Sequence, residues 1–291
     1  MRKLESYLGI VPVLFMLVCL GLAEQLDPCQ KGQVAKLGER YVIGLAFLPG
    51  KEVSEWGRGV DPSNQTVWRN PCVPTDRRAL EDLGVTSAVY SLKVESLQLL
   101  RIEAGLQLLQ DTFRGSPQVL SVVAYNGDMM TSPRVILRNS SASSGESGSV
   151  ISVPLILQFS QGGKAVGFWK DRQCGACAED LRGALSAAGV SLEFEPKATC
   201  MGSSSCAVDI RSCAECLRSG GAQQKAACLT FCSTTFNVGW AGTDGSSQPL
   251  ISSYVITESN DFSFAGLFTD NVASAVNATR DAFQAFAGLF S

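Results

Sequence analysis

Residues 150–169, VISVPLILQFSQGGKAVGFW, contain the pattern that decides the fold class. Two apolar runs, Val150–Phe159 and Lys164–Trp169, flank a Gln-Gly-Gly tripeptide at 161–163. Glycine tolerates positive φ, so this tripeptide is a good hairpin turn. The stretch therefore predicts two antiparallel strands joined by a tight turn.

Short apolar runs separated by turn signals recur throughout residues 39–170, which is typical of strands. Residues 97–113 are ambiguous because their leucines fit both helical and strand spacing. Strands without alternating helices favour an antiparallel β-sandwich or barrel over a parallel sheet. We predict a β-rich α+β fold, with strands within Tyr41–Leu48, Tyr90–Glu95, Val119–Tyr125 and Val135–Leu137.

Residues 139–149 contain six serines and two glycines, so they cannot contribute to a core. As a linker this segment would split the β region, whereas as a long exposed loop it would join two strands of one sheet. We prefer the loop because strand-like runs adjoin both of its ends.

The N-terminus has the pattern of a secretory signal peptide. Arg2 and Lys3 precede the apolar run Leu8–Leu22, and small residues precede the predicted cleavage after Ala23. A signal anchor would share this pattern, but the run has about 15 residues and a membrane-spanning helix needs about 20. We predict a signal peptide over 1–23 and, with no later apolar stretch long enough to span a membrane, a secreted chain.

Cysteine usage agrees with an oxidising compartment. Of 11 cysteines, Cys19 leaves with the signal peptide, and the remaining ten predict five disulfides. Eight of them lie within residues 174–232, which separates a cysteine-rich helical module over 173–240 from a β-rich domain over 24–172 and a C-terminal strand and helix over 241–291. The predicted disulfide cysteines are Cys29, Cys72, Cys174, Cys177, Cys200, Cys206, Cys213, Cys216, Cys228 and Cys232.

The spacing of the last four cysteines predicts how they pair. Cys213 and Cys216 share one helical face, Cys228 and Cys232 share another, and Ser-Gly-Gly at 219–221 breaks the segment between them. Two short antiparallel helices would nest a Cys216–Cys228 bridge inside a Cys213–Cys232 bridge. A bond between Cys29 and Cys72 would join the N-terminal segment to the body, and the other four cysteines leave three pairings open.

Two other interpretations of the cysteines remain. The C-x-x-C pairs at 174–177 and 213–216 look like halves of a zinc ribbon, but a secreted chain meets oxidants before free zinc, so we predict no metal. Residues 164–188 resemble the strand, Trp, C-G-x-C and helix order of thioredoxins, which would make Cys174 and Cys177 a redox pair. The proline that faces the active site in that family is missing, since Pro196 lies too close to the motif.

Composition excludes several classes of function. The chain is 45% hydrophobic and 18% charged, as in folded proteins, and it has no histidine, which removes Ser-His-Asp and Cys-His nucleophile pairs. Without residues 1–23 it has 22 basic and 26 acidic residues, a net charge of −4, and no basic cluster that would indicate nucleic acid or an anionic membrane. We predict no catalytic residues and no cofactor. A carboxylate-based glycosidase, which needs no histidine, is the remaining enzyme class.

Three N-glycosylation sequons, at Asn64, Asn139 and Asn277, fit the secretory route. Asn139 is the strongest of the three because it opens the polar stretch that must be exposed.

The C-terminal segment predicts an amphipathic helix. Five apolar side chains fall within about 40° of one line at 100° per residue, and Asp270 or Asn271 can cap the start. Core docking is preferred over membrane contact or partner binding because the polar face is not rich in Lys and Arg. The apolar stripe consists of Val272, Val276, Phe283, Phe286 and Phe290.

Residues 171–177, DRQCGAC, together with 206–216 and 228–232, resemble the secreted "Expp" proteins of land plants. The resemblance implies a plant extracellular protein and transfers no catalytic residue.

These observations lead to a functional hypothesis. We expect a secreted, disulfide-stabilised, N-glycosylated binding protein of the extracellular space or cell wall, without catalytic turnover. Its ligand would be an extracellular molecule such as a cell-wall glycan or a protein. The alternatives are a thiol-disulfide oxidoreductase using Cys174 and Cys177, or a glycosidase.

Overall fold

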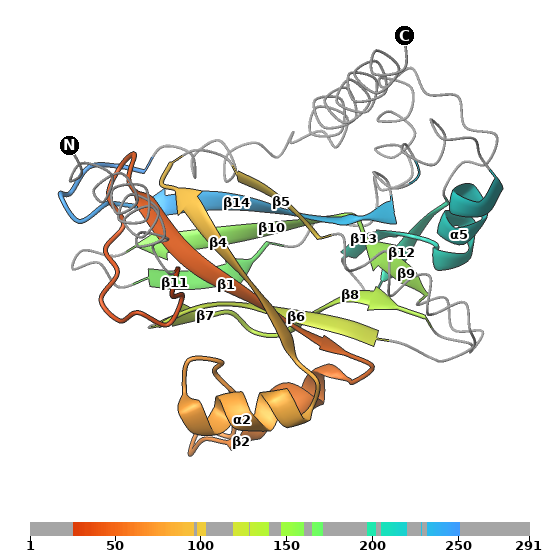
Figure 1. The fold of residues 1–291 in the computed structure, drawn as a ribbon, viewed down its shortest axis with the longest axis horizontal. Coiled ribbons are helices and arrows are strands. Elements are labelled where there is room, and N and C mark those ends of the chain that lie inside the picture. Colours follow the sequence, from red (N-terminus) through yellow and green to blue (C-terminus); the bar gives the residue numbers. More distant parts are fainter. Residues whose placement is uncertain are drawn as a thin grey trace, which may run out of the picture.

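The computed structural model describes residues 26–95, 98–102, 119–127, 129–139, 147–159, 165–170, 197–201, 205–219, 228 and 232–250. The described part of the chain is built around two β-sheets that share one core (Figure 1). In this part of the chain both sheets keep open edges, so neither closes into a barrel.

The larger sheet has eight strands, in the order β12-β13-β9-β8-β6-β1-β4, with β7 paired to β6. All of its pairings are antiparallel. The strands are β1 (Arg40–Pro49), β4 (Thr86–Lys93), β6 (Val119–Asn126), β7 (Met129–Met130), β8 (Arg134–Arg138), β9 (Gly148–Val150), β12 (Ala198–Met201) and β13 (Ser205–Val208).

The smaller sheet has four strands, in the order β11-β10-β14-β5. Strands β10 and β11 form the antiparallel hairpin that residues 150–169 predict, with Leu155 opposite Trp169. Strands β10 and β14, in contrast, are parallel, which the expectation of purely antiparallel pairing did not include. The strands are β5 (Gln98–Ile102), β10 (Ser152–Phe159), β11 (Ala165–Trp169) and β14 (Thr234–Gly242).

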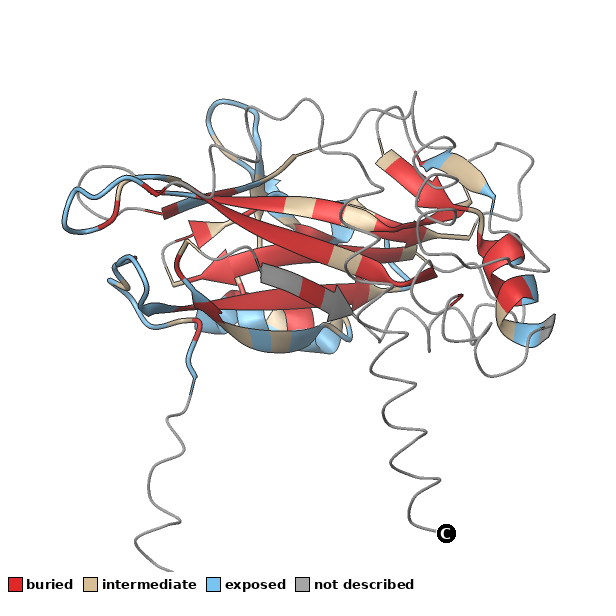
Figure 2. Ribbon diagram, turned by 90° about the horizontal axis from the view of Figure 1, so that it is seen from above, coloured by how far each residue is buried: buried red, intermediate tan, exposed pale blue. Residues whose placement is uncertain are grey.

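A core of apolar side chains joins the inner faces of the two sheets. Tyr41 of β1 contacts both Phe159 and Trp240 edge to face, with ring centroids 5.2 and 5.8 Å apart. Phe159 and Trp240 stack on each other. The buried residues run along the centre of both sheets (Figure 2). This burial explains the alternating and continuous apolar runs that identify the strands.

Residues 50–85 form a cap on the outer face of the larger sheet. The cap contains the 3-10 helix η1 (Val53–Trp56), the hairpin of β2 (Gly57–Val60) and β3 (Thr66–Trp68), and helix α2 (Pro74–Asp82). Trp56 and Leu80 are buried in a second apolar cluster with Leu48 of β1 and Tyr125 of β6. Because the cap covers it, β1 is apolar on both faces, which is why its sequence does not alternate.

The cysteine-rich segment contains both helix and strands. Helix α5 (Ile210–Ser219) carries Cys213 and Cys216, and the structure contains the nested bridges Cys213–Cys232 and Cys216–Cys228 that their spacing predicts. Strands β12 and β13 and most of β14, however, come from the same range. The first two belong to the larger sheet and β14 belongs to the smaller one. The range 173–240, predicted as a cysteine-rich helical module, thus contains helix α5 and also strands, for which cysteine spacing carries no signal.

The remaining structural predictions concern several separate segments. Strands β8 and β9 are antiparallel neighbours, so residues 139–149 join two strands of one sheet. The ambiguous range 97–113 begins with strand β5, and the rest of it lies outside the described residues. The predicted signal peptide, the pair Cys174 and Cys177, the C-terminal helix and Asn277 also lie outside them. No helix among the described residues is long and apolar enough to cross a membrane.

Candidate functional site

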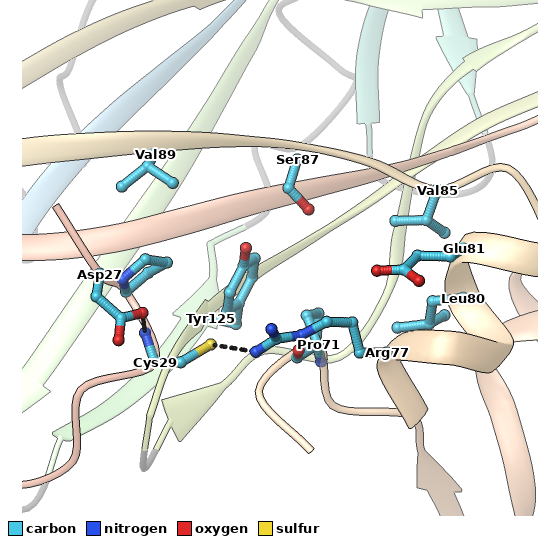
Figure 3. Close-up of a pocket in the computed structure, with 11 residues that line it drawn as sticks. Asp27, Cys29, Pro71, Arg77, Leu80, Glu81, Val85, Ser87, Val89 and Tyr125 are labelled. Atoms are coloured by element: carbon cyan, nitrogen blue, oxygen red, sulfur yellow. Dashed lines mark hydrogen bonds between the residues drawn. The ribbon is translucent and has the colours of Figure 1, made fainter. Parts of the chain in front are cut away.

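A pocket of about 360 Å³ lies between the N-terminal segment, the cap and the outer face of the larger sheet (Figure 3). Its apolar lining comes from Leu80 of α2, Val85, Val89 of β4 and Tyr125 of β6. The whole lining comes from three stretches of the chain, residues 27–29, 71–89 and 125. The pocket is therefore a product of the tertiary fold, and no single motif encodes it.

Helix α2 forms one wall of the pocket, and the residues of its first turn fix the place where it begins. Pro74 lies in the first turn, where a missing N–H has no cost. Asp76 is buried there and accepts hydrogen bonds from the backbone N–H of Asn70 and from Arg58, at 3.0 and 3.3 Å. A carboxylate in the first turn also stabilises the positive end of the helix dipole. This start orients the next turn so that Arg77, Leu80 and Glu81 line the pocket.

The opposite wall is fixed by a disulfide. Cys29 and Cys72 are bonded, with their Cα atoms 5.1 Å apart, and this is the bridge that the sequence suggests between the N-terminal segment and the body. Arg77 reaches across the same region, because its Nε donates to the carbonyl of Pro71 at 2.9 Å and its Nη2 contacts Cys29 Sγ at 3.5 Å (Figure 3). The bridge and the guanidinium together hold residues 27–29 beside α2.

Gly44 determines the depth of the pocket floor. It lies opposite Tyr125 in the β1–β6 ladder, and the ring of Tyr125 covers it. A Cβ atom at position 44 would lie 2.2 Å from Cζ of that ring. Only glycine therefore leaves Tyr125 in the place where it lines the pocket.

Replacing Gly44 by Ala is expected to lower the free energy of unfolding by about 1 to 3 kcal/mol, because the ring of Tyr125 must move. Chemical denaturation measures the change. In a Tyr125→Ala background the same substitution should cost much less, because the clash is gone, and this coupling identifies the cause. Equal costs in the two backgrounds would show that the ring contact does not matter.

The polar groups around the apolar floor carry both signs of charge. Arg77 is the cation, and Asp27 and Glu81 are the carboxylates. Asp27 also accepts the backbone N–H of Cys29 at 2.8 Å, which orders the segment at the pocket rim. An apolar floor with a few polar groups at its edge is the usual composition of a ligand-binding pocket.

The predicted site residues are spread over the fold, and of these Cys29 lines the pocket. Asn64 is exposed with a φ of 62° in the turn between β2 and β3, and Asn139 follows β8. Cys200 and Cys206 lie opposite each other in the β12–β13 hairpin, and both are disulfide-bonded. Cys213 and Cys216 are bonded to Cys232 and Cys228, so their sulfurs are not available as zinc ligands.

Sequence reasoning missed α2 and the pocket residues that it carries. A signal was present, because Pro-Thr-Asp at 74–76 is a typical helix start, and Arg77 and Glu81 are four residues apart. The pocket itself could not be found from sequence, since Tyr125 and Val89 have the pattern of ordinary strand residues.

A second organised feature is the loop after β14, where Asp244 ties two distant segments together. Its carboxylate accepts the backbone N–H groups of Gln248 and Ser246, both at 2.8 Å, and that of Leu37 at 3.2 Å. These bonds, first of all the one from Gln248, and the charge of Lys36 lower the pKa of Asp244 below its usual value. Since every donor is a backbone group, the role of Asp244 is structural.

The lowered pKa predicts how stability depends on pH. The contribution of Asp244 is fully present above the unfolded-state pKa of about 3.9 and is lost as pH falls through the lower folded-state pKa. Replacing Asp244 by Asn should lower the Tm at pH 7 by about 2 to 4 °C and make the fall in Tm between pH 5 and pH 2 shallower. Thermal unfolding across that range checks both effects. Parallel curves for the two proteins would show that the carboxylate charge makes no contribution.

Comparison with known proteins gives one family. The family model described as "Uncharacterised protein DDB_G0273449" matches residues 121–273, slightly more than half of the chain. None of the curated proteins and none of the solved structures matches. The matched range begins within β6 and includes Tyr125, whereas α2 and β4 precede it.

Proposed function

The chain belongs to the family described as uncharacterised protein DDB_G0273449, and we propose that it is a secreted, non-catalytic binding protein whose ligand occupies the pocket between α2 and β4. The ligand belongs to the extracellular space or cell wall and is a glycan or a protein. The observation that carries the proposal is the pocket itself, with an apolar floor, a polar rim and a disulfide in its wall. Disulfides fit a protein that folds in an oxidising compartment.

The proposal is tested by binding. The purified secreted chain is applied to an array of glycans and cell-wall polymers, beside two variants of α2. Glu81→Lys reverses a charge that lines the pocket, while Asp82→Lys reverses the next charge on the same helix, which is exposed and is not part of the lining. Both variants change the net charge equally, so nonspecific electrostatic effects are matched.

A ligand signal that falls about tenfold for Glu81→Lys and is unchanged for Asp82→Lys supports the pocket as the binding site. Equal losses in the two variants would contradict it, because they would reflect net charge alone. Binding that neither variant changes would place the ligand elsewhere on the molecule and would also contradict the proposal.

A glycosidase is the second candidate because Asp27 and Glu81 line the same pocket. Glycosidases need two carboxylates on either side of the scissile bond. Release of shortened oligosaccharides from array ligands, abolished by Glu81→Gln and by Asp27→Asn, would replace the binding function with this one. Ligand retained without shorter products supports the binding protein.

The proposed secretion includes N-glycosylation at Asn64. This residue is exposed in the turn between β2 and β3, and its φ of 62° lies in the left-handed region that asparagine tolerates. The turn is held by Asp61, whose carboxylate accepts the N–H groups of Ser63 and Gln65 at 2.9 Å.

When the protein is secreted from eukaryotic cells, replacing Asn64 by Gln is therefore expected to lower its mass by that of one N-glycan. Mass spectrometry before and after treatment with a peptide N-glycosidase measures it, and Thr66→Ser is the control that keeps the sequon. An unchanged mass for Asn64→Gln would show that this site is unoccupied.

A further inference from the structure

Strand β4 is an edge of the larger sheet, and β1 is its strand partner among the described residues (Figure 1). It has eight residues, whereas the other three edges, β5, β11 and β12, have five, five and four. Its first seven residues, TSAVYSL, carry no charge and no proline. Edge strands usually contain charged residues or proline, which prevent pairing with other chains. This edge therefore has the properties of one that accepts another strand.

The register shows which backbone groups face outward. The N–H of Val94 donates to the carbonyl of Glu39 at 2.9 Å, so this pair is hydrogen-bonded across β4 and β1. Hydrogen-bonded pairs alternate along an antiparallel ladder. The N–H and C=O groups of Ser87, Val89 and Ser91 consequently point away from β1.

The other side of β1 supports this assignment. Val42, opposite Ser91, directs its N–H to the side chain of Gln33 and its carbonyl to Asn126, on the side away from β4. The outward groups of Ser87 and Val89 have no such partner within the described part of the chain. Both residues are exposed, and each has one donor and one acceptor at the edge.

The same two residues line the pocket. Ser87 and Val89 lie on the outer face of the sheet, which is the face toward α2 (Figure 3). A strand added beside β4 would place the side chain opposite either residue with its Cβ about 4.5 to 5.5 Å from theirs. That side chain would enter the pocket, so backbone pairing and pocket filling occur at the same positions.

The pocket selects a large apolar side chain. Its floor of Leu80, Val85 and the Tyr125 ring is apolar, and its volume of about 360 Å³ leaves room for an aromatic ring. A second copy of this chain, pairing through its own β4, would offer Ser and Val on that face, which are too small to fill the space. A partner segment with an aromatic residue fits better.

We propose that the ligand is an extended peptide segment that adds to β4 as a further strand and inserts one aromatic side chain into the pocket. This inference rests on the proposed binding function and names the partner of that same site. Backbone hydrogen bonds to Ser87 and Val89 supply affinity, and the pocket supplies the preference for the aromatic side chain.

The test uses synthetic peptides and the full secreted chain. The first peptide is fluorescein-labelled Thr-Lys-Thr-Phe-Thr-Glu-Thr, and a twin has Gly in place of Phe. Two further forms of the Phe peptide are N-methylated on one or the other set of alternate residues. Only one of these two sets can face β4, so N-methylation of that set removes the donors to the strand while leaving every side chain intact. Fluorescence anisotropy gives each Kd.

We expect the Phe peptide to bind at least tenfold more tightly than the Gly peptide. One N-methylated form should bind at least tenfold more weakly than the parent, and the other should bind like the parent. In the protein, Val89→Pro removes an outward N–H without breaking the ladder to β1 and should weaken binding about tenfold. Val89→Thr keeps that N–H and should bind like the wild type. If Val89→Pro fails to fold, the N-methylated peptides still decide the question.

Several outcomes would overturn the inference. Equal affinity of the two N-methylated forms would exclude strand pairing, and equal affinity of the Phe and Gly peptides would exclude filling of the pocket. A dimer in sedimentation that becomes a monomer in Val89→Pro would make a second copy the occupant of the edge. If no peptide binds but an array ligand still depends on Glu81, this inference is wrong and the proposed function stands. If neither the peptides nor the array ligands bind at the pocket, the inference and the proposed function are both wrong.

Discussion

Replacing Cys228 by Ser is expected to lower the free energy of unfolding by about 2 to 5 kcal/mol and to reduce the yield of folded protein. The bridge from Cys216 to Cys228 closes a loop of 12 residues, and both of its cysteines are completely buried. After its loss, the bridge from Cys213 to Cys232 is the described disulfide that still joins α5 to the segment before β14. Urea denaturation of the purified variant measures the change.

The control for this experiment is the double variant Cys216→Ser/Cys228→Ser, which lacks the bridge and also lacks an unpaired thiol. Similar losses in the single and double variants would assign the effect to the bridge. A stable double variant beside an unstable single variant would assign it to the free cysteine instead and would contradict the prediction.

Replacing Trp240 by Ala is expected to cost about 3 to 5 kcal/mol of stability, because a fully buried indole is lost from the contact between the two sheets. Trp240 stacks on Phe159 and contacts Tyr41 at its edge, so these two rings would line the resulting cavity. Chemical denaturation again gives the value.

Phe168→Ala is the matched control, since Phe168 belongs to the same four-stranded sheet and is 40% exposed. Its cost should be well under that of Trp240→Ala. Comparable costs for the two variants would mean that the aromatic cluster does not dominate the contact between the sheets.

The sequence predicted the elements whose structure depends on residues close together in the chain. The Gln-Gly-Gly hairpin is such a case, because turn chemistry and two apolar runs lie within 20 residues. The nested bridges of α5 are another, since helical periodicity alone puts Cys213 and Cys216 on one face.

Features that depend on distant residues were not predicted. The parallel pairing of β10 with β14 joins Ser152 to Thr235, and no sequence pattern encodes such a partner. Helix α2 was missed because its nine residues are mostly polar, so only Leu80 is both apolar and buried. The pocket could not be predicted for both of these reasons. One wall is the polar helix α2, and another is β4, whose place at the sheet edge follows from the strand order.

The parallel pair also has a consequence for the order in which the chain folds. Strand β10 is complete at residue 159, but its central partner β14 begins 75 residues later, at Thr234. Pairing across such a separation is slow, because the loop must close before any contact rewards it. Synthesis from the N-terminus exposes β10 and β11 as an incomplete sheet until β14 emerges. We expect the four-stranded sheet to form last, so this hairpin is the part of the nascent chain that most needs protection from aggregation during synthesis.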